Sequence, residues 1–262
     1  MSLSLAQGTL RQKDYWWTVF KRTWKGGVIS SFVSPLFYVV AMGVLLGGFI
    51  KGDPTRLEGA TSYLAFVAPG MVAAQAMTTV FGEMTYPVMG SIKWHRSYFA
   101  MTASPLGVPE VILANLGFAI FRVAVTCAVF LAVMAPFGVF ASLPGVLAAF
   151  VVQLLIGLAF ATPIYAYSAG AKDESAFALV FRLGMIPLFL FSGAFFPVAN
   201  LDGWMEALAK VTPLWHGVDL TRMLTLGHVD WAMAAVHVGY LAAMAVAGWF
   251  WAVRRLTRRM VS

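Results

Sequence analysis

The sequence predicts an all-α membrane protein with six transmembrane helices, and two observations on charge and composition support this fold class. Between Arg122 and Lys172 the chain runs 49 residues without one Asp, Glu, Lys or Arg. A charge in mid-bilayer costs several kcal/mol, and a helix crosses the roughly 30 Å apolar layer in about 20 residues. That stretch therefore suits two crossings and a turn at 136–145. Hydrophobic residues also make up 60% of the chain and charged ones only 11%, against roughly 25% charged in soluble domains.

Six stretches poor in charge are long enough to cross as helices, which satisfy their own backbone hydrogen bonds in lipid. They are about Val28–Ile50, Gly59–Gly82, Val111–Ala135, Gly145–Ala169, Ser175–Phe196 and Trp231–Val253. The period-two alternation of a membrane barrel is not seen in them. We therefore expect one transmembrane domain over residues 1–262, with a six-span bundle at 28–253 and a tail at 254–262.

The Lys and Arg residues outside the spans are distributed unevenly between the two sides. One side holds twelve of them: Arg11, Lys13, Lys21, Arg22, Lys25, Lys93, Arg96, Lys172, Arg254, Arg255, Arg258 and Arg259. The other side holds four: Lys51, Arg56, Lys210 and Arg222. Because cytoplasmic loops carry the excess of Lys and Arg, both termini are expected in the cytoplasm. An even number of spans requires the same.

Residues 1–27 are expected to form a helix in the cytoplasmic headgroup plane. Trp17, Phe20 and Trp24 recur at i, i+3 and i+7 with Trp16 beside them, and basic residues flank these rings. Such a pattern places aromatic rings in the membrane interface and cations near anionic lipid. The alternative is an ordinary basic flank that only sets the topology.

The region between the fifth and sixth spans is unusual. A helix breaker, Pro197, ends the apolar run, and a short amphipathic helix follows. Its apolar face is formed by Leu201, Trp204, Met205, Leu208 and Thr212. Pro213 stops this helix, and a second short segment runs from Leu214 to Leu226. Both are too short or too polar to span, so the sequence predicts a re-entrant hairpin or two interfacial helices on the outer side.

Motifs for catalysis, cofactors and metals are missing from the sequence. No phosphate-binding loop, zinc-protease helix, nucleophile elbow or dinucleotide fingerprint is present. The four histidines are far apart in the sequence and at different expected depths: His95, His216, His228 and His237. The single cysteine, Cys127, lies in an apolar run and suits a packing role. The net charge of +7 mostly flanks the spans, which disfavours nucleic-acid binding. We therefore expect no catalytic, cofactor or metal residues.

Two arginines lie inside predicted spans, where charged residues are functional candidates. Arg122 is about 11 residues deep, roughly 17 Å at 1.5 Å per residue, and should face a wet or protein-lined interior. Arg182 is about two turns deep and can extend to the cytoplasmic headgroups. Glu83 and Glu110, at cytoplasmic span ends, are possible partners for Arg182. No acidic residue is expected at mid-depth, which disfavours ion-coupled transport.

Small residues in the first span suggest a contact between copies. Gly43-x-x-x-Gly47 permits close helix approach and could form a dimer seam. Such spacing also arises by chance in glycine-rich spans.

Three segments resemble the ABC-2 type permeases, the membrane subunits of bacterial ABC exporters. The outer region reads FSGAFFP at 191–197, then Leu201 and Trp204, then TPLWHGVDLTR at 212–222; YLAFVAPGM at 63–71 resembles the family's second span. The resemblance covers essentially the whole chain. It is closest to NodJ-type permeases of lipo-oligosaccharide export and next to daunorubicin-resistance permeases.

The resemblance implies a half-transporter in the bacterial inner membrane. A second permease copy, as a homodimer or with a similar partner, and two separate ATPase subunits that carry ATP and Mg would complete it. The loop at 86–109 resembles the region that couples permease and ATPase. The residues expected there are Gly90, Lys93, Trp94, His95 and Arg96, with Lys172, Asp173 and Glu174 and the N-terminal helix beside them. A merely solvated loop is the alternative.

The implied function is ATP-driven export of an amphipathic lipid-linked glycan or lipophilic molecule. Phe191, Phe195 and Phe196 are our hypothesis for an outer gate, with Trp215 and His216 along the same path; a packing role is equally plausible. Hydrophobic drug efflux is the runner-up cargo. An ion-coupled transporter and a membrane enzyme acting on lipid are the alternatives from other classes. The cargo and the choice between homodimer and heterodimer stay open.

Overall fold

Four long apolar helices form the body of the molecule. The computed structural model describes residues 4–38, 40, 41 and 57–261, and every regular element in these ranges is helical. The helices long and apolar enough to cross a membrane are Tyr63–Lys93, Val108–Phe137, Leu143–Gly170 and Trp231–Met260. They contain the third, fourth and sixth predicted spans and all but the first four residues of the second, so the all-α class and four of the six spans agree with the structure.

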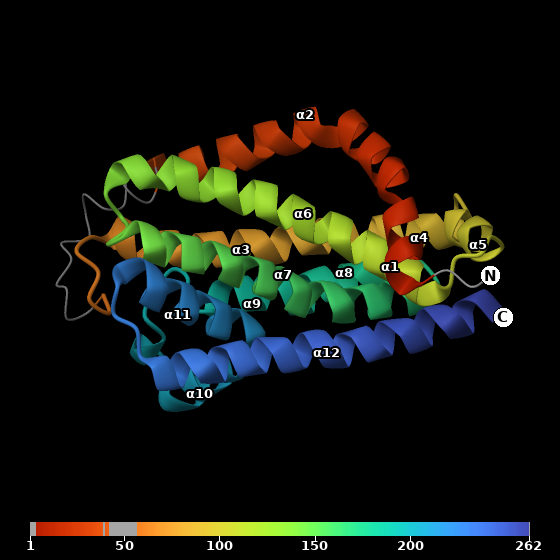
Figure 1. Cartoon of the computed structure of the whole chain (residues 1–262). Coiled ribbons are helices and arrows are strands. Elements are labelled where there is room, and N and C mark those ends of the chain that lie inside the picture. Colours follow the sequence, from red (N-terminus) through yellow and green to blue (C-terminus); the bar gives the residue numbers. More distant parts are fainter. Residues whose placement is uncertain (1–3, 39, 42–56, 262) are drawn as a thin grey trace.

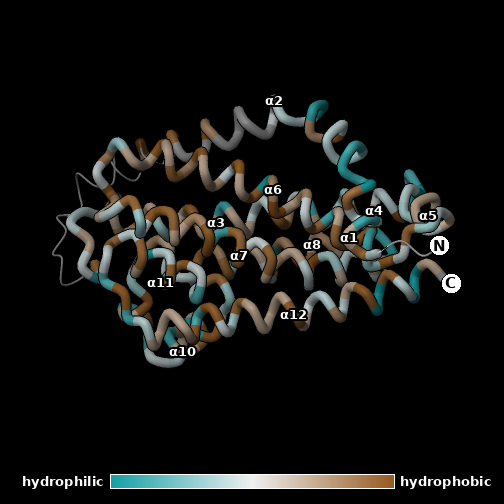
Figure 2. The backbone as a smooth tube through the Cα atoms, in the orientation of Figure 1, coloured by the Kyte–Doolittle hydropathy of each residue, from teal (hydrophilic) through white to brown (hydrophobic). Residues whose placement is uncertain are grey.

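These four helices lie side by side in Figure 1. The first comprises α3 (Tyr63–Met84) and α4 (Tyr86–Lys93), and the second comprises α6 (Val108–Met134) with the turn η3 (Ala135–Phe137). The third and fourth are α7 (Leu143–Gly170) and α12 (Trp231–Val261). Apolar residues follow the middle of the bundle, and hydrophilic residues gather where both chain ends lie, beside α5 (Ser97–Thr102) (Figure 2). We call this the α5 end and the opposite one the α11 end.

Helix α7 is the centre of the bundle and packs against α3, α6 and α12. Its start is set by Ser142, whose hydroxyl accepts a hydrogen bond from the Gly145 N–H at 3.2 Å. Both α3 and α7 carry many small buried residues, among them Ala68, Ala73, Ala76, Ala159, Ala161 and Ala166. Small side chains let helix backbones approach closely, which is the usual packing of helices in membranes.

The fifth predicted span is shorter in the structure than expected. It comprises α8 (Ser175–Leu179), the π-helical η4 (Val180–Met185) and α9 (Ile186–Phe191). These 17 residues measure about 25 Å, less than the apolar layer. The helix ends there because Gly193 takes a left-handed conformation (φ 78°) and Pro197 follows.

Residues 39 and 42–50 of the first predicted span lie outside the described residues, and these include Gly43 and Gly47. The N-terminal segment comprises α1 (Leu5–Arg11) and α2 (Lys13–Tyr38). Helix α2 runs without interruption through residue 27, where the interfacial segment was expected to end. In Figure 1, α2 begins at a steep angle to α6, bends, and then follows α6 toward the α11 end.

Helix α2 packs on the bundle through two aromatic rings. Trp16 stacks on Phe118 with ring centroids 4.8 Å apart, and Phe20 meets Phe121 edge-on at 5.1 Å. Trp17 and Trp24, which the sequence placed in the membrane interface, are exposed. The packed residues are therefore spaced i, i+4, and both contacts lie on α6.

Three short elements follow α9: η5 (Val198–Asn200), α10 (Gly203–Val211) and α11 (Pro213–Leu226). The Thr212 hydroxyl accepts from the Trp215 N–H at 3.4 Å, and Gly227 ends α11 with φ 78°. Helices α10 and α11 lie where the sequence placed two short helices, but the two differ from each other in burial. Helix α11 is mostly buried against α3, α7 and α12, whereas α10 exposes Trp204, Leu208 and Val211.

Candidate functional site

The residues expected to couple to an ATPase form an exposed turn at the α5 end. Lys93, Trp94, His95 and Arg96 are consecutive and exposed, and we call them the α4–α5 ridge. The Gly90 carbonyl accepts from the Trp94 N–H at 3.1 Å and the His95 N–H at 2.8 Å, which closes α4. Arg96 then takes a left-handed conformation (φ 50°) and starts α5. The chain thus turns sharply and presents all four side chains outward.

Gly90 is needed at this turn because the Trp94 ring lies over it. A Cβ added at Gly90 would come 3.0 Å from the Trp94 Cε3 atom, closer than ordinary van der Waals contact. Trp94 nevertheless keeps 51% of its surface exposed. The ridge therefore combines two cations with a large, seated aromatic ring, a composition typical of protein interfaces.

The loop at Lys172, Asp173 and Glu174 lies at the same end of the bundle as the ridge. The Ser175 hydroxyl and the Ser175 N–H (3.0 Å) both donate to the Asp173 carboxylate, and these bonds hold the pKa of Asp173 below its ordinary value. The Lys93 ammonium acts in the same direction, so Lys93 and Asp173 are within electrostatic reach. All three loop residues are exposed.

At the α11 end a buried arginine joins four segments, and we call this arrangement the Arg222 hub. Arg222 is 4% exposed. Its Nη1 pairs with the Glu58 carboxylate at 2.7 Å, and its Nη2 donates to the Gly193 carbonyl at 2.7 Å. Nε and Nη2 both lie 3.4 Å from the Phe66 carbonyl, and the guanidinium carbon lies 4.0 Å from the Phe66 ring centroid. The hub ties α11 to α3 and to the segment after α9.

A chain of polar side chains links α11 to α12. The Nδ1 atoms of His216 and His237 are 2.7 Å apart, and His237 Nε2 is 3.0 Å from the Asp219 carboxylate. Both contacts are satisfied when His237 donates to Asp219 and accepts from His216. Tyr240 stacks on His216 with ring centroids 4.0 Å apart. The expectation that these histidines lie at separate depths was wrong, because α11 folds back along α12.

Within the described ranges the structure groups no set of His, Cys, Asp and Glu that could hold a metal ion. His216, Asp219 and His237 bond one another. Asp219 contacts Nε2 of His237, and His216 contacts Nδ1 of the same ring. They therefore serve as a buried contact between two helices.

The five residues proposed for an outer gate are divided among three places. Phe191 lines a groove of about 380 Å³ between α9 and α10, opposite Trp204. Phe195 meets Phe189 edge-on at 5.0 Å, and its carbonyl accepts from the Tyr63 hydroxyl at 2.9 Å. Phe196 is half-buried in the same bend.

The remaining two gate candidates lie toward α12. Trp215 meets the rings of both His216 and His237, at 5.0 Å and 5.2 Å. Only Phe195 and Phe196 therefore share the bend that follows α9, and Trp215 approaches it at Gly193.

The two arginines predicted inside spans have different surroundings. Arg122 Nε pairs with the Glu83 carboxylate at 3.0 Å, and both side chains are 20% exposed. Glu83 was expected near Arg182, and that assignment was wrong, because α3 presents Glu83 to α6. Arg182 is exposed on η4 and makes no ion pair within the described part of the chain.

Sequence reasoning missed the Arg222 hub, although a signal existed. Leu214, Val218 and Arg222 follow one another at i, i+4 and i+8, and all are buried. An arginine that continues an apolar stripe is a candidate for a buried ion pair. The partner, 164 residues earlier, could not be read from this spacing.

Comparison with known proteins decides the family. The ABC-2 type transporter family matches residues 14–226, which include α2 through α11. This chain belongs to the ABC-2 type transporter family. It is a transmembrane permease subunit of an ABC exporter, and ABC-2 permeases work with a separate ATPase subunit. The family that the sequence motifs suggested is thereby confirmed.

The permease is similar to several proteins over most of its length. Nodulation protein J of Rhizobium leguminosarum bv. trifolii is 32% identical over 255 residues, 94% of each chain. Nodulation protein J of Sinorhizobium fredii is 30% identical, again over 94% of each chain. The daunorubicin resistance ABC transporter permease protein DrrB1 of Streptomyces coeruleorubidus is 24% identical over 76% of this chain and 69% of its own length.

Removal of the hub cation should destabilise the permease. Arg222→Met removes the donor to the buried Gly193 carbonyl, at about 1–3 kcal/mol, and also removes the ion-pair partner of Glu58. We expect thermal unfolding in detergent to occur at least ~5 °C lower. Lys210→Met is the matched control, because Lys210 pairs with Glu206 at 2.6 Å on the exposed face of α10 and should shift unfolding by less than ~1 °C. Equal unfolding temperatures for the two variants would show that the hub does not stabilise the fold.

Proposed function

We propose that this permease exports an amphipathic, lipid-linked glycan from the cytoplasm or inner leaflet, driven by two ATPase subunits that bind the α4–α5 ridge. The observation that carries the proposal is the ridge itself. Four consecutive exposed residues, two of them cations, lie at the end of the bundle where both chain ends and the loop 172–174 also lie (Figure 1). In a family that works with a separate ATPase, such a surface suits the docking of that subunit. ATP and Mg would be held by the ATPase, not by this chain.

The proposed topology follows from the same arrangement. Six crossings place both termini and the ridge in the cytoplasm of a bacterium, with the chain in its inner membrane. The segment 191–226 then enters from the outer side without crossing, which agrees with the short α9 and the buried α11. Gln12, between α1 and α2, donates to the Glu110 carbonyl at the start of α6 at 3.1 Å, and this contact suits a position of the α1–α2 junction in the cytoplasmic headgroup layer.

A second permease copy would cover the exposed side of the fifth span. Leu179, Leu183, Ile186 and Leu190 are exposed at i, i+4, i+7 and i+11, which is the spacing of a helix–helix seam. Neither η4 nor α9 contributes a buried residue within its own chain. We propose that two copies pack here in a homodimer, around the pathway.

The second candidate cargo is a hydrophobic drug, favoured by the similarity to a daunorubicin resistance permease. The glycolipid is preferred because the chain resembles NodJ-type permeases of lipo-oligosaccharide export more closely. Ion-coupled transport is less favoured, because the acidic residue nearest mid-bundle, Glu83, is already paired with Arg122. A lipid-modifying enzyme is less favoured because the sequence has no recognised catalytic motif.

The test is reconstitution of this chain with the ATPase subunit that co-purifies with it from its own membrane. Inside-out vesicles should accumulate an acylated oligosaccharide upon ATP addition, and should accumulate daunorubicin more slowly. Faster uptake of daunorubicin would favour the second cargo. Uptake driven by a proton gradient without ATP would overturn the proposal.

Substitutions in the ridge should uncouple the ATPase. Trp94→Ala and Arg96→Glu remove the aromatic ring and invert one charge, and an interface residue of this kind is worth about 2 kcal/mol, or ~30-fold in affinity. We expect the affinity for the ATPase subunit to fall by about that factor, while the thermal stability of the permease stays unchanged. The matched control is Trp204→Ala, a tryptophan 71% exposed at the other end of the bundle. ATPase binding reduced equally by both tryptophan variants would count against the ridge.

Truncation of the two phenylalanines in the bend should loosen the proposed outer gate. Phe195→Ala with Phe196→Ala removes apolar side chains that would exclude water, so basal leak of a small polar dye should rise severalfold while ATPase binding stays normal. Phe99→Ala, at the α5 end, is the control. Normal leak and normal export in the double variant would contradict the gate hypothesis and would leave Phe195 and Phe196 with a packing role.

A further inference from the structure

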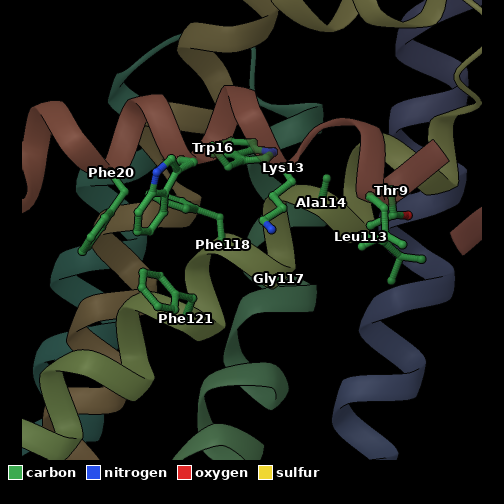
Figure 3. A pocket seen from close by; sticks show the side chains of 11 residues that line it. Thr9, Lys13, Trp16, Phe20, Leu113, Ala114, Gly117, Phe118 and Phe121 are labelled. Carbon is green, nitrogen blue, oxygen red and sulfur yellow. The ribbon is translucent and has the colours of Figure 1, made fainter. Parts of the chain in front are cut away.

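A pocket of about 320 Å³ lies between α1–α2 and α6, at the α5 end of the bundle. Figure 3 shows aromatic rings of both helices along its walls. The rings are Trp16, Trp17, Phe20, Phe118 and Phe121. The floor is Gly117, which is exposed and has no side chain to fill the space. The pocket is thus an apolar hollow roofed by the N-terminal helices.

One cation lines this apolar pocket. The Lys13 side chain extends from α2 toward α6 between the pocket's rings (Figure 3). Further cations stand on the same helices: Arg11, Lys21, Arg22 and Lys25, with Lys21 lying 5.7 Å from the Trp17 ring centroid. A hollow with apolar walls and basic residues at its rim is complementary to a ligand with an anionic head and an apolar body.

A polar atom in the pocket wall also lacks a partner. The indole Nε1 of Trp16 is buried and makes no hydrogen bond within the described residues. Buried donors are nearly always paired in native proteins, and an unpaired one calls for an explanation.

A second apolar groove adjoins the pocket across α6. It measures about 480 Å³ and lies between α6, α7 and α12. Leu113 and Gly117 line both hollows, so the two meet over this stretch of α6. The second groove has no charged lining residue; Ile120, Leu158 and Trp249 are among its walls. Two apolar grooves that meet below one cation match a molecule with two chains and one anionic head.

We propose that the permease holds one anionic phospholipid at this place, with its phosphate at Lys13 and its two acyl chains in the grooves on either side of Gly117. The lipid fastens α1 and α2 to α6. The proposal rests on the position of α1–α2 in the cytoplasmic headgroup layer, and it is independent of the cargo and of ATPase docking. The occupant is a resident membrane lipid.

The test measures lipid retention by the full-length permease, purified in mild detergent and analysed by native mass spectrometry. Phosphatidylglycerol and phosphatidylethanolamine with identical acyl chains are added separately at equal concentrations. We expect the wild type to retain one phosphatidylglycerol about tenfold more than phosphatidylethanolamine. Equal retention of the two lipids would overturn the proposal, whatever the result of any transport assay.

Two variants separate the head group from the chains. Lys13→Gln should bring the preference for phosphatidylglycerol to within about twofold, whereas Lys25→Gln, a cation on the same helix outside the pocket, should keep it. Gly117→Leu should lower retention of both lipids at least fivefold by filling the floor of the grooves. A Cβ at Gly117 meets no heavy atom within 4 Å, so the fold accommodates the change.

Gly239→Leu is the control for the glycine variant, because Gly239 is equally open and exposed but lies on α12 outside both grooves. It should retain lipid like the wild type. Wild-type retention by Gly117→Leu would contradict the proposed position of the chains. Lys13→Gln changes an exposed side chain and decides the role of the head group even if Gly117→Leu fails to fold.

Discussion

Hydrocarbon offers no hydrogen-bond partner, so each polar group inside this bundle must find its partner within the protein. Arg222 shows the consequence most fully, since one guanidinium is paired with a carboxylate and with two backbone carbonyls. Arg122 is paired with Glu83, and His237 is held between His216 and Asp219. Each of these contacts joins a helix to another segment of the bundle: Arg222 joins α11 to α3, Arg122 joins α6 to α3, and His237 joins α12 to α11. The need to satisfy polar groups thereby determines which helices pack together.

The two ends of the bundle differ in whether their charged side chains are buried or exposed. At the α11 end the arginine is buried and bonded, so α11 and the bend after α9 are held in place. At the α5 end the charges of the ridge are exposed and available to a partner. The α3–α4 helix pair connects the two, since Phe66 belongs to the hub and Lys93 to the ridge. A movement imposed on the ridge by an ATPase would therefore reach the outer bend along one nearly continuous helix.

The fold class, four spans, the short helices α10 and α11 and the family could be predicted from the sequence, because each depends on local composition or on a contiguous motif. The partner of Glu83 was assigned wrongly, and His216 and His237 were wrongly placed at separate depths. Contacts between helices depend on the rotation of each helix about its axis, which residue spacing alone does not specify. For the same reason the stacking of Trp16 on Phe118 was not predicted.

The central claim is that the α4–α5 ridge binds a separate ATPase on the cytoplasmic side, and cysteine cross-linking tests it most directly. The single native cysteine, buried Cys127, is first replaced in Cys127→Ser. In that background, Trp94→Cys should react with maleimide only from the cytoplasmic side and should cross-link to the ATPase subunit, whereas Trp204→Cys should do neither. Labelling of position 94 from the outside, or cross-linking to the ATPase from position 204, would contradict the account.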